Sequence, residues 1–523
     1  MSSKYYLIII EVVPVDANNK LIVKNTGYLY FRSFLLLVIS LYTSRLVLQA
    51  LGVDNYGIYN AVGGFVAMFT ILSRAMSSAS QRYITFALGE TGKKGVRNVF
   101  QTCVNLHIVL AGIMVVLLEA IGIWFVSTTL NIPSGRETAA LFVLQFSIVS
   151  LFVHVICVPF DALVVAHEHM KAFAYVGIFE AVAKLGIVFL LFLSSFDTLV
   201  IYCFLILLCD ISKFIIYRTY CYKQFSESRM LKWDIDKGLF KEMFAFSGWN
   251  LFGQGSYLLR NQGIDILLNI FFGVTVNAAK GVCNQVQNAV TNFVSNFQAA
   301  LYPQVTKSLA QDNIDRMHSL IVSGSKISFF LLSMICIPLS LNLREVLGLW
   351  LVEVPQFTLE FIQLTLVFML MDTQSRLLIH GIDSTGKIKN YQLIVGSTKL
   401  LALPITYVML KMGGGVLSGL VVNIGLELFC FGERLYFCRK QISLSIMRFL
   451  TKVTIRCVVV FAIAYLLSFF ASHYLNFHFF FDILIAIIIS AIAIWFLGFS
   501  KDERKKLMES IMSFVKRKMN KQV

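Results

Sequence analysis

LGVDNYGIYNAVGGFVAMFTILSRAMSSASQRYITFAL, residues 51–88, is matched later in the chain by FGVTVNAAKGVCNQVQNAVTNFVSNFQAALYPQVTKSL, residues 272–309. At a constant offset of 221 residues the two stretches share Gly52/Gly273, Val53/Val274, Thr70/Thr291, Ala79/Ala300, Thr85/Thr306 and Leu88/Leu309. Two later pairs keep the same order, because AKL at 183–185 recurs as TKL at 398–400 and YCYKQ at 220–224 recurs as FCRKQ at 437–441. One ancestral unit is therefore present twice, and in a membrane chain such a duplication is typical of a two-lobed transporter.

Composition places the chain in a membrane. Of its 523 residues 57% are hydrophobic and only 14% are charged, and the mean hydropathy is +0.75, whereas a soluble domain carries about 25% charged residues. Backbone polar groups in lipid must be satisfied within the segment, so long apolar runs predict helices. We expect an all-α integral membrane protein with about 14 spans and no soluble domain. The spans are expected at 25–49, 56–82, 102–127, 138–161, 172–194, 198–220, 243–268, 276–302, 319–341, 356–380, 389–410, 415–437, 450–472 and 479–499.

The duplication also predicts the domain organisation. Its offset maps span 2 on span 8, span 5 on span 11 and span 6 on span 12, so the repeated unit has six helices. Six is an even number, so both copies enter the membrane from the same side, and the pseudo-twofold axis runs along the membrane normal. The expected parts are a lead-in (1–24), an N-lobe (25–224), a linker (225–242), a C-lobe (243–441), two further helices (442–500) and a basic tail (501–523).

The net charge of +16 is better explained by membrane topology than by a nucleic-acid partner. The Lys and Arg residues gather in one set of loops and in the tail, whereas the opposite loops hold only Arg136, Arg344 and Lys411. The side rich in Lys and Arg is the cytoplasmic one, so both termini are expected in the cytoplasm. The tail could lie on the anionic inner leaflet as an amphipathic helix, or it could simply fix the topology.

No catalytic or metal motif is found. The ten Cys lack any CxxC spacing and fall mostly inside apolar runs, which predicts reduced, buried thiols. His167-Glu168-His169 does not have the HExxH spacing of a helical zinc site. We therefore expect a protein that is not an enzyme and that needs neither a cofactor nor a metal.

Charged residues inside the expected spans need an explanation, since each costs roughly 2.5–3.5 kcal/mol at the centre of a membrane helix. Lys184 and Lys399 lie near mid-span in helices that the repeat makes equivalent, and Asp210 and Glu427 are a second equivalent pair. Glu180 lies one helical turn before Lys184. These lysines either line a wet central cavity or form ion pairs between helices, and Asp210 and Glu427 could pair them or carry protons.

Two further polar groups lie within spans. Asp372 and Arg376 are spaced to neutralise each other on one helix, and Arg260 and Asp265 flank an amide-rich patch in the span at 243–268. The next span carries Lys280, Asn284, Gln285, Gln287, Asn288, Asn292, Asn296 and Gln298. So many amides suit a water-filled lumen or a sugar ligand, although hydrogen bonds between helices are the alternative.

Cations outnumber acids among the lumen candidates. These cations are Arg45, Arg74, Lys184, Arg260, Lys280, Lys326 and Lys399. A cavity of this sign favours an anionic substrate, and the planar guanidinium group suits phosphate oxygens. The alternative for Arg32, Arg45 and Arg74 is that they extend to lipid head groups from nearby helix ends.

The segments YTSRLVLQALGVDNYGIYNAVGG (Tyr42–Gly64) and AMSSASQRYIT (Ala75–Thr85) resemble the first two helices of Wzx-type polysaccharide flippases. These flippases belong to the multidrug/oligosaccharidyl-lipid/polysaccharide (MOP) exporter superfamily, which also contains the MATE transporters. The span count and the six-helix duplication fit that resemblance between residue 25 and the tail. Arg45 and Arg74 look similar in position to the lumen arginines of related flippases.

The resemblance implies transport of undecaprenyl-pyrophosphate-linked oligosaccharides across the bacterial inner membrane by alternating access, for O-antigen or capsule synthesis. It implies a monomer. The expected partners are membrane lipids and, in the same pathway, a polysaccharide polymerase and chain-length proteins. Substrate contacts are expected from Arg45, Arg74, Lys184, Arg260, Lys280 and Lys399, and ion coupling or charge pairing from Glu180, Asp210, Asp265, Asp372 and Glu427. The alternatives are a cation-coupled multidrug exporter of the same fold and a polysaccharide polymerase or ligase.

Overall fold

The computed structural model describes residues 17–90, 93–128, 132, 135–192, 196–229, 236–272, 274–351, 354–475, 478–501 and 503–505. Within these ranges the regular secondary structure is entirely helical. Most of the expected lead-in and most of the basic tail lie outside the described residues, so the tail's expected amphipathic helix stays a prediction.

The first six helices form the N-lobe. They are α1 (Ala17–Met68), α2 (Thr70–Glu90), α3 (Lys93–Thr128), α4 (Glu137–Ala166), α5 (Met170–Leu191) and α6 (Thr198–Gln224). Helix α1 is broken at Gly52, whose φ of 74° and ψ of 169° are not helical and suit a residue without a Cβ atom. The break separates the first expected span from the second, which continues through a bend into α2.

The next helices form the C-lobe. They are α7 (Lys237–Phe272), α8 (Val274–Ala310), α9 (Ile314–Leu341), α10 (Leu343–Trp350), α11 (Thr358–Thr385), α12 (Lys389–Leu400), α13 (Ala402–Lys411) and α14 (Ser418–Ile442). A 3₁₀ turn, η1 (Ser226–Ser228), precedes them. The span expected at 389–410 is divided into α12 and α13 at Leu401, and the short α10 was not anticipated.

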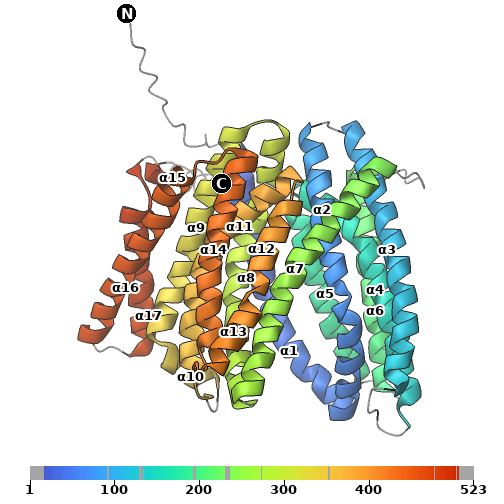
Figure 1. The fold of residues 1–523 in the computed structure, drawn as a ribbon. Helices are drawn as coiled ribbons and strands as arrows, with labels where there is room; N and C mark the ends of the chain where they lie inside the picture. Colours follow the sequence, from blue (N-terminus) through green and yellow to red (C-terminus); the bar gives the residue numbers. More distant parts are fainter. Residues whose placement is uncertain are drawn as a thin grey trace, which may run out of the picture.

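The two lobes repeat one pattern of helix packing. In the N-lobe, α1 packs on α5, α2 and α3 pack on α4, α4 packs on α6, and α5 packs on α6. The same pairings recur in the C-lobe as α7 with α12, α8 and α9 with α11, α11 with α14, and α12 with α14. Figure 1 shows the lobes side by side, with α1 and α2 of one facing α7 and α8 of the other. The expected fold of two related six-helix lobes is confirmed.

The last helices pack on the outside of the C-lobe. After α15 (Ile446–Phe449) and the π-helical turn η2 (Leu450–Ile455) come α16 (Arg456–Leu475), α17 (Phe479–Ala493) and a second π-helical turn, η3 (Ile494–Gly498). Helices α16 and α17 pack on each other and on α9, at the flank of the molecule away from the N-lobe (Figure 1). They therefore take no part in the contact between the lobes.

Each of the fourteen expected spans falls on a helix or a pair of consecutive helices. In the described part of the chain, nine helices are long and apolar enough to cross a membrane, and a tenth candidate is the pair Asn55–Val66 and Thr70–Glu90, bent by 47°. Helices α7, α8 and α14 are not among the nine. Their amides and charges lower their hydropathy, and such groups in a membrane protein face the protein interior or water.

The docking of α17 on α9 leads to a stability prediction. A Cβ atom on Gly498 would lie 2.8 Å from the ring of Phe330, whereas a Cβ on Gly432 in α14 meets nothing within 4 Å. We expect Gly498→Ala to lower the stability in detergent by about 1–2 kcal/mol because the ring must shift. Gly432→Ala should leave it unchanged or slightly raised, since Ala favours a helix. Thermal unfolding of both variants checks this, and an equal Tm for the two would contradict it.

Candidate functional site

Glu168, in the turn between α4 and α5, connects the two lobes at one end of the molecule through hydrogen bonds. Its buried carboxylate accepts hydrogen bonds from Lys307 Nζ at 2.5 Å and from Gln304 Nε2 at 2.6 Å, both on α8. Asn25 Nδ2 of α1 donates to the Glu168 carbonyl at 3.2 Å. Glu168 has a φ of 61°, a conformation that L-residues seldom adopt and that the turn holds here. This end of the molecule is called the closed end below.

Arg82 of α2 makes a second contact between the lobes at the closed end. Its Nε donates to the carbonyl of Ser384 at 3.2 Å, in the last turn of α11, where the helix dipole attracts a cation. The guanidinium also lies over the ring of Phe246 in α7, 5.6 Å from its centroid. Gly386, which ends α11 with a φ of 76°, lies so close that a Cβ atom there would be 2.6 Å from Arg82 Nη2.

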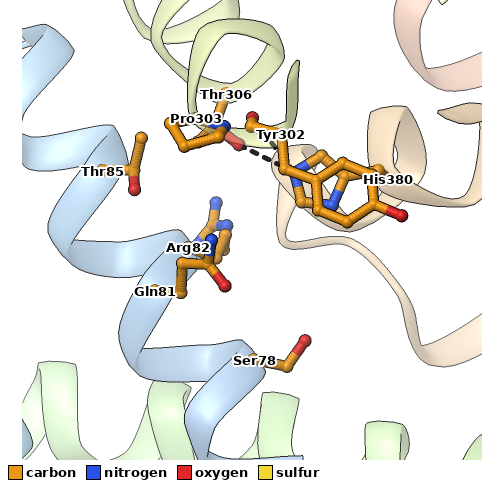
Figure 2. A pocket seen from close by; sticks show the side chains of 8 residues that line it. All are labelled: Ser78, Gln81, Arg82, Thr85, Tyr302, Pro303, Thr306 and His380. Carbon is orange, nitrogen blue, oxygen red and sulfur yellow. Dashed lines mark hydrogen bonds between the residues drawn. The ribbon is translucent and has the colours of Figure 1, made fainter. Parts of the chain in front are cut away.

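A small pocket lies between α2 and the C-lobe at the closed end. It is lined by Ser78, Gln81, Arg82 and Thr85 of α2, by Tyr302, Pro303 and Thr306 of α8, and by His380 of α11 (Figure 2). The His380 ring stacks on Tyr302 with centroids 4.1 Å apart, and its Nε2 lies 3.2 Å from the Tyr302 carbonyl oxygen. The cavity volume of the pocket is about 20 Å³, enough for a water molecule.

Beyond the closed end the facing sides of the lobes carry exposed polar groups. Asn296 Nδ2 of α8 donates a hydrogen bond to Ser33 Oγ of α1 at 2.7 Å. Continuing along the same face of α8, at helical spacing, Asn292 and Gln285 are exposed. On α2 the face that carries Gln81 and Thr85 in the pocket continues to Arg74, which is also exposed. We call this set of exposed facing groups on α2 and α8 the vestibule.

Lys184, Glu180 and Asp210 come together inside the N-lobe rather than in the vestibule. Glu180 of α5 lies between two lysines, at 2.8 Å from Lys184 Nζ and 2.7 Å from Lys213 Nζ of α6. The charge of Asp210 also acts on Lys184, and Asp210 is hydrogen-bonded to Ser150 of α4. The cluster thus connects α5 and α6 by ion pairs, and the hydrogen bond between Ser150 and Asp210 connects α4 to them.

Arg260, Glu427 and Lys399 come together inside the C-lobe. Glu427 of α14 is buried between Arg434 of the same helix, to which it is hydrogen-bonded, and Arg260 of α7, whose Nη1 lies 3.8 Å from Glu427 Oε2. The charges of both arginines and of Glu427 act on Lys399 of α12. The repeat-equivalent lysine and acid are therefore neighbours in both lobes.

The other candidate residues have local partners or lie elsewhere. Asp372 and Arg376 form the expected pair within α11, with Arg376 Nη2 at 2.7 Å from Asp372 Oδ2. The charge of Lys280 acts on Asp265, to which Asn284 is hydrogen-bonded. The side chain of Arg45 lies outside the described residues.

One lumen candidate lies far from the vestibule. Lys326 of α9 is buried on the outer flank of the C-lobe, where it pairs with Glu503 and lies 5.5 Å from the Phe499 ring centroid. Its place corrects the expectation that it lines the lumen. The cause is the docking of the chain after α17 on α9, which brings an acid to this lysine.

Sequence reasoning missed the fastening residues Glu168, Gln304 and Arg82. Glu168 belongs to the His-Glu-His turn that was considered only as a metal site, and no cluster able to hold a metal ion occurs among the described residues. The turn instead uses His167 to hold Glu227 of η1 at 2.6 Å. Burial raises the pKa of Glu227, but the hydrogen bonds with His167, a backbone N–H and Ser226 together outweigh it, so the pKa lies below the usual value.

Comparison with known proteins shows the fold. No family model and no curated protein sequence matches the chain. Among solved structures, a MATE protein in complex with MaD3S superposes with a TM-score of 0.67 at 14% identity, covering 82% of this chain and 96% of that one. A multidrug resistance MATE family transporter of the MOP superfamily, in an outward-facing conformation, gives 0.67 at 13% identity over 82% and 97%.

A third similar structure is a MOP superfamily transporter from Pyrococcus furiosus, whose binding pocket of reverse polarity is described as suggesting a different function. It gives a TM-score of 0.66 at 12% identity and covers 83% of this chain and 100% of that one. At such identities the similarity shows the fold alone. The chain is therefore a multi-pass membrane protein with the fold of MOP superfamily transporters.

The closed end should open when Glu168 loses its charge. All ten native cysteines are buried, so a cysteine placed at Thr85 in the pocket reports water access there. Hydrogen bonds to a charged group contribute about 1.5–3 kcal/mol. We therefore expect Glu168→Gln to raise the rate at which a water-soluble maleimide labels Thr85→Cys about tenfold or more.

A matched control for this experiment is Asp312→Asn, at the exposed turn after α8 on the same end. It removes an acid that does not join the lobes, and the labelling rate should stay the same. Equal rates in the Glu168→Gln and control backgrounds would show that the Glu168 contacts do not hold the lobes together.

The N-lobe network predicts unequal effects of its members. Glu180→Gln leaves Lys184 and Lys213 without their shared carboxylate and should lower stability by about 2 kcal/mol. Lys184→Gln should cost less, because Glu180 keeps Lys213 at 2.7 Å. Thermal unfolding in detergent measures both, and a larger loss for Lys184→Gln would contradict the geometry.

Proposed function

We propose that this protein transports oligosaccharides linked to undecaprenyl pyrophosphate across the bacterial inner membrane, as a flippase in the synthesis of a surface polysaccharide such as O-antigen or capsule. The observation that carries the proposal is the vestibule: Arg74 of α2 and Gln285 and Asn292 of α8 are exposed, on the helix faces that meet the other lobe at the pocket and at the Asn296–Ser33 hydrogen bond. The MOP transporter fold supplies the two lobes between which such a substrate moves.

The vestibule chemistry suits both polar parts of this substrate. A guanidinium group offers paired N–H donors that match phosphate oxygens, and it stays charged at any physiological pH. Amide side chains both donate and accept hydrogen bonds, as sugar hydroxyls do. A positive wall between low-dielectric lobes also concentrates anions. The vestibule thus fits a molecule that joins a pyrophosphate to sugars.

Alternating access follows from the contacts at the closed end. Arg316, at the start of α9, donates a hydrogen bond to Gln304 at this end at 3.3 Å. It belongs to the Lys- and Arg-rich set of connections, so the positive-inside rule favours a cytoplasmic closed end. The conformation described here would then expose the vestibule to the opposite leaflet. Return to the cytoplasmic side requires Glu168 to leave Lys307 and Gln304, and requires Arg82 to leave the Ser384 carbonyl and the Phe246 ring.

A cation-coupled multidrug exporter is the second candidate, because a multidrug resistance transporter is among the structures with this fold. Such coupling needs an acid that is free to bind a cation. Glu180 is held by two lysines, and Asp372 and Glu427 are held by arginines. Pocket polarity has also been read as a sign of different function in another MOP transporter. These pairings favour the anionic substrate.

The proposal predicts that Arg74 is needed for transport. In liposomes that contain the purified protein and a lipid-linked oligosaccharide, Arg74→Gln should lower the flipping rate at least about tenfold, the effect of losing one charged hydrogen-bond pair. Arg74→Lys should keep part of the rate, since it keeps the charge but loses the paired donors. Lys411→Gln, at the end of α13 and outside the vestibule, serves as the matched control.

Two results would count against the proposal. The first is an Arg74→Gln variant that flips lipid-linked sugar at the control rate. The second is a deletion strain that keeps its surface polysaccharide, accumulates no lipid-linked repeat units and becomes sensitive to cationic drugs. The second result would favour the multidrug exporter.

A further inference from the structure

The charge cluster inside the C-lobe contains more positive than negative groups. Arg434 and Arg260 lie on either side of the Glu427 carboxylate, and the charges of these three residues act on a third cation, Lys399. Asp372 also acts on Lys399 and Arg434, but Arg376 already neutralises it at 2.7 Å. Charges in a membrane interior are stable only when they are compensated or wet.

Two other acids lie near the cluster. The charge of Arg82 acts on Asp383 more strongly than that of Lys399, so Asp383 is assigned to Arg82. Glu433 of α14 accepts a hydrogen bond from the Thr398 hydroxyl at 2.7 Å, which does not compensate its charge, so Glu433 is counted with the cluster. Three cations then face two carboxylates, and one positive charge remains. The N-lobe cluster differs, because Lys184 and Lys213 share Glu180 and Asp210 lies beside them.

Arg260 carries N–H groups that no protein acceptor meets. Its side chain is 1% exposed, and neither Nε nor Nη1 has a hydrogen-bond partner within the described residues. The rings of Tyr257 and Phe368 lie against the guanidinium, 5.1 and 5.4 Å from Cζ to the ring centroids. An aromatic face attracts the charge but does not replace an acceptor in the plane of the guanidinium. A buried, unpaired donor of this kind is costly.

The cluster lies next to Tyr257, on the face of α7 that contacts the N-lobe. Tyr257 lies at helical spacing from Phe246, which contacts Tyr83 and Arg82 of the N-lobe, and its side chain is 38% exposed. The same ring has Arg260 Cζ at 5.1 Å and Lys399 Nζ at 6.0 Å from its centroid. The partly exposed ring of Tyr257 therefore lies beside both cations.

We propose that this C-lobe cluster binds a small monovalent inorganic anion, of the halide class, beside Tyr257 and between Arg260 and Lys399. The anion compensates the surplus charge and accepts hydrogen bonds from Arg260 Nε and Nη1. It enters from the vestibule past the Tyr257 ring. The site is distinct from the vestibule face that carries Arg74. It does not depend on which substrate the vestibule carries.

The test uses the full-length protein purified in detergent, with sodium chloride exchanged for sodium gluconate at constant ionic strength. Chloride and bromide should raise Tm in a saturable manner, since a ligand that binds only the folded state stabilises it. Arg260→Gln and Lys399→Gln should each lose this shift. Lys184→Gln, which changes the equivalent lysine of the N-lobe, should keep it.

A variant that should bind the anion more tightly distinguishes loss of the site from loss of folding. Glu427→Gln removes the competing negative charge from the cluster, so half of the Tm shift should occur at a chloride concentration at least about tenfold lower. The proposal is overturned if chloride and gluconate give the same Tm, or if Arg260→Gln and Lys399→Gln both keep the shift. A shift with pyrophosphate and none with any halide would also overturn it.

Discussion

The structure depends on one constraint, that a charge between membrane-spanning helices must meet an opposite charge, a hydrogen-bonding group or water. The lobes satisfy this constraint in different ways. In the N-lobe, Glu180 lies between Lys184 and Lys213 and closes a compact network. In the C-lobe, Glu427 lies among three cations and leaves a positive excess. Between the lobes, Arg74 is exposed on the same face of α2 that lines the pocket.

This distribution separates what holds each lobe together from what joins the two. Contacts inside a lobe are extensive and apolar, with buried side chains such as Phe361 and Leu377 in a large core. The contacts at the closed end include a few polar ones, from Glu168 to α8 and from Arg82 to the end of α11. The lobes also share apolar packing, because Leu29, Ala79 and Met170 of the N-lobe belong to the same buried core. Rocking about a central site would separate these apolar surfaces as well as the polar contacts.

The sequence was sufficient to predict the helices and their duplication, because hydropathy and repeat spacing are local properties of the chain. It also identified the charged residues near mid-span, Lys184 and Lys399 among them. It could not say which neighbour each residue would meet. Helical spacing relates residues on one helix to each other, but it does not tell which side of that helix faces the other lobe. Lys326 therefore seemed a lumen residue until Glu503 was found beside it.

The fastening at the closed end was the least predictable part, because Glu168 and Lys307 are 139 residues apart and lie at loop and helix ends. The measurement that tests the whole account most directly is water access to the vestibule. A water-soluble thiol reagent should label Asn288→Cys, an exposed position of α8, rapidly, and should not label Leu467→Cys, which is 52% exposed on α16. Lipid-linked oligosaccharide should protect the first site. Equal labelling of the two sites, or labelling at position 288 that the substrate leaves unchanged, would contradict a water-filled pathway for an anionic lipid.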